Sequence, residues 1–273
     1  MQKPKRTSCA HGASIIGTTI MALLLTVLSG CGNFNSDETV LRAFVDGGCS
    51  AESSGDIELS ELVILDWDGG VNRIYPDRSL SGLDFAAFPL EDGGTLADRA
   101  EEFMQDVRDQ VAAIYCERDD ISLRVINGDD SVAQGIVTVV HITQDSRPGG
   151  GTDVGEGEYD PCNEEADNAA IVFGERVRSL SKAYSYGEWV NVFANIAAHE
   201  IGHTFGFGHV DRNEFVDLGR TLYVELMLSG HTMAELRRPN RFVVDLPNCP
   251  ANAKAGVVSS KATQPCRLLG HAH

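Results

Sequence analysis

The chain has 273 residues, of which 42% are hydrophobic, and a formal net charge of −18 at pH 7. This acidic balance makes binding to nucleic acid or to anionic lipid headgroups by charge a poor expectation. The apolar content is ordinary, so the chain is long enough to bury one good hydrophobic core.

The first 30 residues are typical of a bacterial signal peptide. Three basic residues occur within the first six, and residues 15–28 form an apolar run that is too short to span a bilayer comfortably. The run ends in Leu-Ser-Gly-Cys, which resembles a lipobox with Cys31 as the lipidated residue. An ordinary secretory signal with a chance cysteine is the alternative. Loss of residues 1–30 would change the formal charge from −18 to −21.

We therefore expect export to the bacterial cell envelope, with a lipid on Cys31 holding the protein at a membrane. Gly32 after this cysteine resembles lipoproteins that are passed to the outer membrane. Residues 31–56 are rich in small, polar and acidic side chains and are interpreted as the lipidated N-terminus and tether. The main folded domain is predicted to cover residues 57–250, and residues 251–273 to form a C-terminal tail.

Five of the seven cysteines remain after Cys9 in the leader and Cys31 are set aside. An exported protein favours disulfides. Cys249 with Cys266 is the best candidate pair and would tie down the tail, and Cys49 with Cys116 is the second. One thiol is then left over. Cys162 lies within the main predicted domain.

Alternating helix and strand patterns follow the tether. Residues 61–66 predict a buried strand that runs into a glycine turn, and residues 71–94 predict a loop. Thr95 can cap a long helix whose apolar residues recur at helical spacing up to Ile114. Three further strands are predicted around residues 121–125, 135–143 and 170–174. His141 on the second of them is interpreted as structural.

Residues 145–168 form a segment rich in glycine and acid, which is too long for a plain connection. It is interpreted as a rim around a cleft or as a loop held by a disulfide. Its acidic residues are possible calcium ligands, although a solvated acidic surface is the alternative. These residues are Asp153, Glu156, Glu158 and Asp160.

A helix beginning near Ser185 carries the most informative motif. Ser185 and Glu188 fit a capping box, and the apolar residues that follow should face the core. His199 and His203 are spaced by four residues, so their side chains lie one turn apart on the same helix face. Two imidazoles can then reach one metal ion.

The residues between and after this pair are predicted to complete a catalytic metal site. Glu200 lies beside the ion, where its carboxylate can take a proton from a coordinated water. Gly206 can adopt a positive φ, end the helix and let His209 return as the third ligand. A fourth position stays open for water or substrate, as in catalytic rather than structural zinc sites.

The pattern His199, Glu200, His203, Gly206 and His209 resembles the HExxHxxGxxH signature of the metzincin zinc peptidases. The resemblance implies an α+β fold over roughly residues 60–250, with a twisted mixed β-sheet backed by two long helices and a small C-terminal subdomain. It also implies a methionine turn beneath the metal, with Met227 as first candidate and Met233 as second.

One position departs from that pattern. Astacin-like and serralysin-like members carry a tyrosine two residues after the methionine, whereas Ser229 stands here. We therefore assign no tyrosine to transition-state stabilisation. The other histidines of this half (His231, His271 and His273) are interpreted as ordinary surface residues.

We expect a monomeric, lipid-anchored zinc endopeptidase. It would hydrolyse a protein or peptide with one catalytic zinc ion and Glu200 as general base. Two alternatives stay open. One is a surface binding lipoprotein that keeps a metallopeptidase fold without turnover. The other is a zinc-dependent hydrolase that acts on a bond other than a peptide.

Overall fold

A computed structural model describes residues 44–45, 48–49, 61–116, 123–128, 137–160, 165, 167–210 and 224–242. The predicted signal peptide, Cys31, Cys162, Cys249, Cys266 and the tail after residue 250 lie outside these residues. Cys116 is disulfide-bonded, as predicted. Its partner cysteine lies outside the described side chains, so the pairing with Cys49 stays a prediction.

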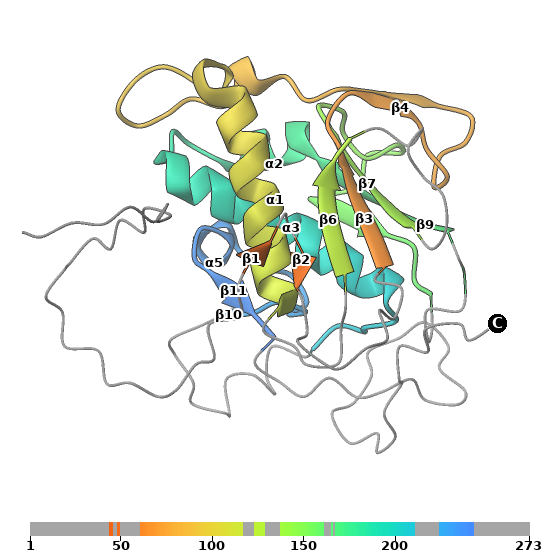
Figure 1. Cartoon of the computed structure of the whole chain (residues 1–273). Coiled ribbons are helices and arrows are strands. Elements are labelled where there is room, and N and C mark those ends of the chain that lie inside the picture. Colours follow the sequence, from red (N-terminus) through yellow and green to blue (C-terminus); the bar gives the residue numbers. More distant parts are fainter. Residues whose placement is uncertain are drawn as a thin grey trace, which may run out of the picture. The chain divides into compact units, whose positions relative to one another are not determined.

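A mostly parallel, twisted sheet of seven strands forms the centre of the fold (Figure 1). Its order is β1-β2-β6-β3-β7-β9-β8. The inner strands β6, β3, β7 and β9 run parallel, and β8 pairs antiparallel with β9 at one edge. The strands are β1 (Phe44–Val45), β2 (Gly48–Cys49), β3 (Glu61–Asp66), β6 (Leu123–Asn127), β7 (Val137–Thr143), β8 (Gly155–Gly157) and β9 (Asp167–Phe173).

Two long helices, α1 (Ala100–Cys116) and α3 (Tyr186–Thr204), pack on the sheet and on each other. The helical segment of α1 begins as predicted after Thr95, whose N–H donates to the Asp98 carboxylate at 2.9 Å; its first turn is the 3-10 helix η2 (Leu96–Arg99). The hydroxyl of Tyr115 then donates to the Ala198 carbonyl at 2.6 Å and joins the two helices. The sequence-based prediction of a mixed fold of sheet and helices is confirmed.

The segment predicted as a loop over residues 71–94 contains regular structure. The strands β4 (Gly69–Val71) and β5 (Ser79–Ser81) form a hairpin, and η1 (Phe85–Ala87) is a 3-10 helix. Leu80 of this hairpin packs with Ile171 and Phe173, in a small cluster separate from the main core. The hairpin has glycines in one strand and serines in the other, so it shows no apolar alternation in the sequence.

Two other predictions need correction. Residues 44–45 and 48–49, which lie in the predicted tether, contribute β1 and β2 to the sheet. Gly174 begins helix α2 (Gly174–Leu180) instead of ending the preceding strand. The segment predicted as a rim does line the cavity described below, and it contains a strand, β8, whose short Gly-Glu-Gly sequence shows no period.

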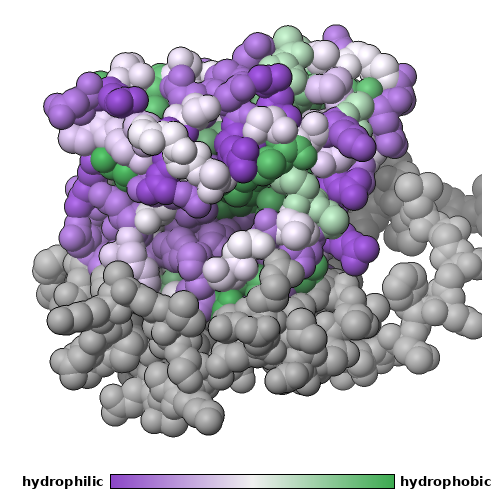
Figure 2. Space-filling model, turned by 180° about the vertical axis from the view of Figure 1, so that it is seen from behind, coloured by the Kyte–Doolittle hydropathy of each residue, from purple (hydrophilic) through white to green (hydrophobic). Residues whose placement is uncertain are grey.

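A small C-terminal part follows α3. The strands β10 (Val224–Glu225) and β11 (Asn240–Arg241) pair parallel, with the short helix α5 (Met233–Leu236) between them. Seen from behind, the described surface is mostly hydrophilic, with apolar residues gathered in a hollow (Figure 2). Within the described ranges, no helix is both long and apolar enough to cross a membrane.

Candidate metal centre

Helix α3 is capped at both its first and its last turn. At its start, the Ser185 N–H donates to the Glu188 carboxylate at 3.0 Å, which confirms the predicted capping box. At its end, Gly206 has a φ of 79°, a backbone conformation that favours glycine. The Gly206 N–H donates to His203 O at 2.9 Å and the Phe207 N–H to Gly202 O at 2.8 Å. These two bonds form a Schellman motif, which turns the chain back toward the helix.

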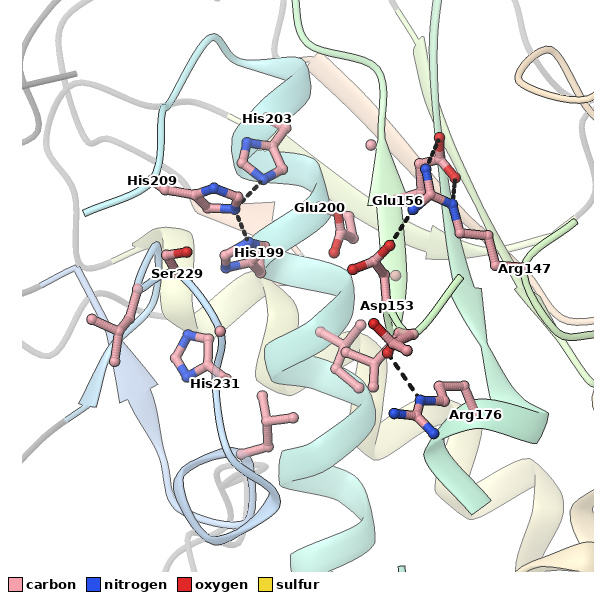
Figure 3. Close-up of a pocket in the computed structure, with 18 of the residues that line it drawn as sticks. Arg147, Asp153, Glu156, Arg176, His199, Glu200, His203, His209, Ser229 and His231 are labelled. Atoms are coloured by element: carbon pink, nitrogen blue, oxygen red, sulfur yellow. Dashed lines mark hydrogen bonds and ion pairs between the residues drawn. The ribbon is translucent and has the colours of Figure 1, made fainter. Parts of the chain in front are cut away.

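The turn brings His209 against the two histidines of α3 (Figure 3). His209 Nε2 lies 3.2 Å from His199 Nε2 and 3.1 Å from His203 Nε2. Three nitrogens bound tetrahedrally to zinc at its usual bond length would be roughly 3.3 to 3.4 Å apart. The three histidines are therefore close enough to bind one metal ion.

The hydrogen bonds of His199 and His203 show which ring nitrogen carries the proton. His199 Nδ1 donates to Leu226 O at 2.7 Å, and His203 Nδ1 donates to Phe207 O at 2.8 Å. Because a carbonyl oxygen can only accept, each Nδ1 is protonated and each neutral ring presents a lone pair at Nε2. A single proton on His209 Nε2 could satisfy only one of these two lone pairs. A metal ion would bind both of them together with a lone pair on His209 Nε2.

Burial keeps these imidazoles neutral. It lowers the pKa of His199 well below the usual value and that of His203 to about 4, with the neighbouring histidines adding to the effect. Burial also lowers the pKa of His209. Neutral imidazole is the form that binds a metal.

Glu200 lies beside this cluster and lines the same cavity, which has a volume of about 590 Å³. The pKa of its carboxyl is raised to about 8, mainly by burial and also by the carboxylates of Glu156 and Asp153, against a backbone hydrogen bond from Gly157 and the charge of Arg147. A divalent cation nearby would oppose this rise, because it favours the charged form.

The strand β8 approaches Glu200 very closely. A Cβ atom on Gly155 would lie 2.5 Å from Glu200 Oε1, and one on Gly157 would lie 2.5 Å from the Glu200 carbonyl oxygen. Real Cβ atoms do not approach other atoms that closely, so a larger residue at Gly155 would displace the Glu200 side chain, and one at Gly157 would press on the helix backbone. Here the glycines allow the edge strand to cover the helix turn that carries the acid.

Met227 lies under the same helix turn. It is fully buried, and a Cβ atom on Gly202 would meet its sulfur at 2.5 Å. Its carbonyl accepts from the Val210 N–H at 2.8 Å, directly after His209. The second candidate, Met233, lies in α5 and is only partly buried.

A network of charged residues lines the cavity beside Glu200 (Figure 3). Arg147 forms ion pairs with Asp153 and Glu156, and Glu156 also accepts from the Tyr75 hydroxyl at 2.5 Å. Among the described residues, the three histidines are the one group whose atoms could hold a metal ion. The predicted calcium ligands form no such group: Glu158 pairs with Arg73, and Asp160 accepts from the Glu165 N–H.

Two residues of the cavity were missed or misjudged in the sequence. His231, predicted as a surface residue, is partly buried, lines the cavity and shares the Leu226 carbonyl with His199, its Nε2 donating at 2.9 Å. Arg176 of α2 also lines the cavity. Neither belongs to a motif, so no local signal identifies them. Ser229, where the resembling families carry tyrosine, is a further lining residue.

Comparison with known proteins adds no relative. No protein-family model matches the chain, and a search of curated proteins finds no match either. The functional assignment therefore depends on the residues of the site.

Proposed function

We propose that this protein is a zinc-dependent endopeptidase of the metzincin type, exported and held at the cell envelope by a lipid on Cys31. The observation that carries the proposal is the convergence of three neutral imidazoles beside the buried Glu200 in one cavity. A structural metal site would need no such acid, and a binding protein would not need its raised pKa.

The donor set fits zinc. Imidazole nitrogen suits zinc better than calcium or magnesium, and three protein ligands leave one coordination position for water or substrate. His199 and His203 are held in the metal-binding tautomer by the Leu226 and Phe207 carbonyls. When bound, the ion supplies a Lewis acid that makes water a nucleophile at neutral pH.

The residues of the chain would then move the proton. Glu200 accepts it from the attacking water and delivers it to the amine nitrogen that leaves. Its buried position limits competing solvent, and burial and the carboxylates beside it favour uptake of a proton by raising its pKa. Strand β8 lines the cavity and ends the sheet, so an extended substrate can add to it as a further strand.

The test compares two glutamates of the same helix. Glu200→Ala should keep bound zinc, measured by elemental analysis, and lose cleavage of a peptide library by roughly 10²- to 10⁴-fold. Glu188→Ala changes a glutamate at the start of α3, outside the residues that line the cavity, and should keep cleavage. Chelator should abolish the wild-type activity, and added zinc should restore it.

Each other result has a distinct meaning. Cleavage that survives in Glu200→Ala would refute Glu200 as the base. Purified protein that neither contains zinc nor responds to it would refute the proposal as a whole. Bound zinc with no peptide cleaved would favour the binding lipoprotein, or a hydrolase that acts on another bond.

A further inference from the structure

The cavity continues beyond the metal-binding histidines along α3. Ile196 lies one turn before His199 and lines the cavity, as do Leu180 from the end of α2 and Leu236 from α5. Ile196 and Leu236 are only 1% and 2% exposed, whereas Leu180 is 42% exposed and lies one turn after Arg176 on α2. An exposed apolar side chain at an open cavity is typical of a surface that binds a ligand.

A positively charged side chain, that of Arg176, also lines the cavity. Arg176 reaches from α2 toward α3, on the side of the helix where Glu200 lies (Figure 3). Its Nε donates to Thr152 O at 2.9 Å, and its Nη1 donates to Ser179 Oγ at 3.4 Å. These two partners orient the guanidinium without neutralising its charge. Several of its five N–H donors remain for a ligand.

The two arginines of the cavity differ in their partners. Arg147 is neutralised by Asp153 and Glu156. Arg176 has no carboxylate within ion-pair distance in the part of the chain that the structure describes. In a chain with a net charge of −18, an arginine in a cavity without a carboxylate partner is suited to bind an anionic group of a ligand.

We propose that this part of the cavity, where Arg176 and Leu180 lie one turn apart on α2, binds a glutamate side chain of the substrate next to the bond that is cleaved. The two methylenes of a glutamate would pack on Leu180, and its carboxylate would accept hydrogen bonds from the Arg176 guanidinium. A lysine in the same place would be repelled. The inference rests on the proposed peptidase function, for which it names a class of substrate.

The experiment uses the full-length protein, loaded with zinc, and capped peptides that differ only at one residue beside the cleaved bond. Glutamate at that residue should give a kcat/KM roughly 10- to 100-fold above glutamine, because a hydrogen bond to a charged group contributes a factor of this size. Arg176→Gln should remove the preference. Arg176→Glu should reverse it in favour of lysine.

The matched control is Arg178→Gln. Arg178 lies on the same helix but pairs with Glu175 and does not line the cavity, so the preference for glutamate should persist. A further peptide presents a free C-terminal carboxylate in place of the glutamate side chain. A preference confined to that peptide would overturn the assignment to a side chain.

Failure of the inference differs from failure of the proposed function. If the wild-type protein cleaves peptides with equal kcat/KM for glutamate and glutamine, or if Arg176→Gln keeps the preference, the inference is wrong and the peptidase remains. Binding to the Glu200→Ala variant, measured by fluorescence anisotropy, tests the pocket without turnover. Equal affinity of that variant for the glutamate and glutamine peptides would overturn the inference even if no peptide is cleaved.

Discussion

Two walls of the cavity act on different parts of the site. The turn that contains Met227 contacts the histidine cluster: the Leu226 carbonyl accepts from His199, and the Met227 carbonyl accepts from Val210, next to His209. The wall that contains β8 contacts the acid instead. Gly155 packs against the Glu200 carboxylate, and nearby carboxylates raise its pKa.

In the proposed function, this difference means that metal binding and proton transfer are supported by separate walls. The first wall acts mainly through backbone carbonyls and one buried methionine, which fix the orientation of imidazole rings. The second acts through close packing and charge, which fix the position and the pKa of a carboxyl group. Changes in the first wall should therefore reduce metal affinity, and changes in the second should reduce turnover while the metal stays bound.

The largest effect is expected for Met227→Ala. Met227 is fully buried against Gly202, so its truncation leaves a cavity beneath the helix turn that carries the histidines. We expect a loss of about 2–5 kcal/mol in the free energy of unfolding, measured by urea denaturation of the metal-free protein. Zinc affinity, measured by chelator competition, should fall by about 10- to 100-fold, as for other residues that support ligands.

Met233→Ala is the matched control for this prediction. Met233 was the second candidate in the sequence, and it is only partly buried in α5. Its truncation should cost less stability and leave zinc affinity unchanged. If Met233→Ala instead weakens zinc binding more than Met227→Ala, the turn after β10 does not support the ligands as the contacts indicate.

A smaller effect, on turnover alone, is expected for Gly155→Ala. The new Cβ atom would lie 2.5 Å from Glu200 Oε1, so the carboxylate or the strand must shift. A displacement of about 1 Å in a catalytic group can cost roughly 10²-fold in rate, and kcat should fall accordingly while bound zinc is retained. Gly187→Ala is the control, because nothing lies within 4 Å of the added atom at that site. Loss of zinc in Gly155→Ala would contradict the separation of the two walls.

The parts of the site that could be predicted from the sequence are local. Ser185 with Glu188, His199 with His203, and Gly206 all act within one helix or at its ends, where spacing in the sequence fixes spacing in space. The convergence of His209 followed from the same short turn. The helix after Thr95 and the strand over residues 61–66 followed from apolar periodicity.

The parts that could not be predicted depend on strand order and on distant segments. Strand β8 has three residues without a period, and its antiparallel place beside β9 brings Gly155 to Glu200 from 45 positions away in the chain. His231 and His199 come from different segments, and both donate a hydrogen bond to the Leu226 carbonyl. Arg176 is one of several arginines in the chain, and only the folded cavity distinguishes it from Arg178.

The smallest effect is expected for Glu156→Gln, which changes charge in the β8 wall with little change in shape. The Glu156 carboxylate raises the pKa of Glu200, and its ion pair with Arg147 offsets a positive charge that lowers this pKa. Removing the carboxylate therefore lowers the pKa of Glu200 through both effects. The base is then deprotonated at lower pH, and the acid limb of the kcat/KM profile should move to lower pH by roughly half a unit to one unit.

The control for this shift is Glu165→Gln, since Glu165 pairs with Arg73 and does not contribute to the pKa of Glu200. Its acid limb should coincide with that of the wild-type protein, and both variants should keep bound zinc. If the acid limb of Glu156→Gln stays in place or moves to higher pH, charge in the β8 wall does not act on the base. The contrast between the two walls would then be one of packing alone, with Gly155 as the feature of the β8 wall that positions Glu200.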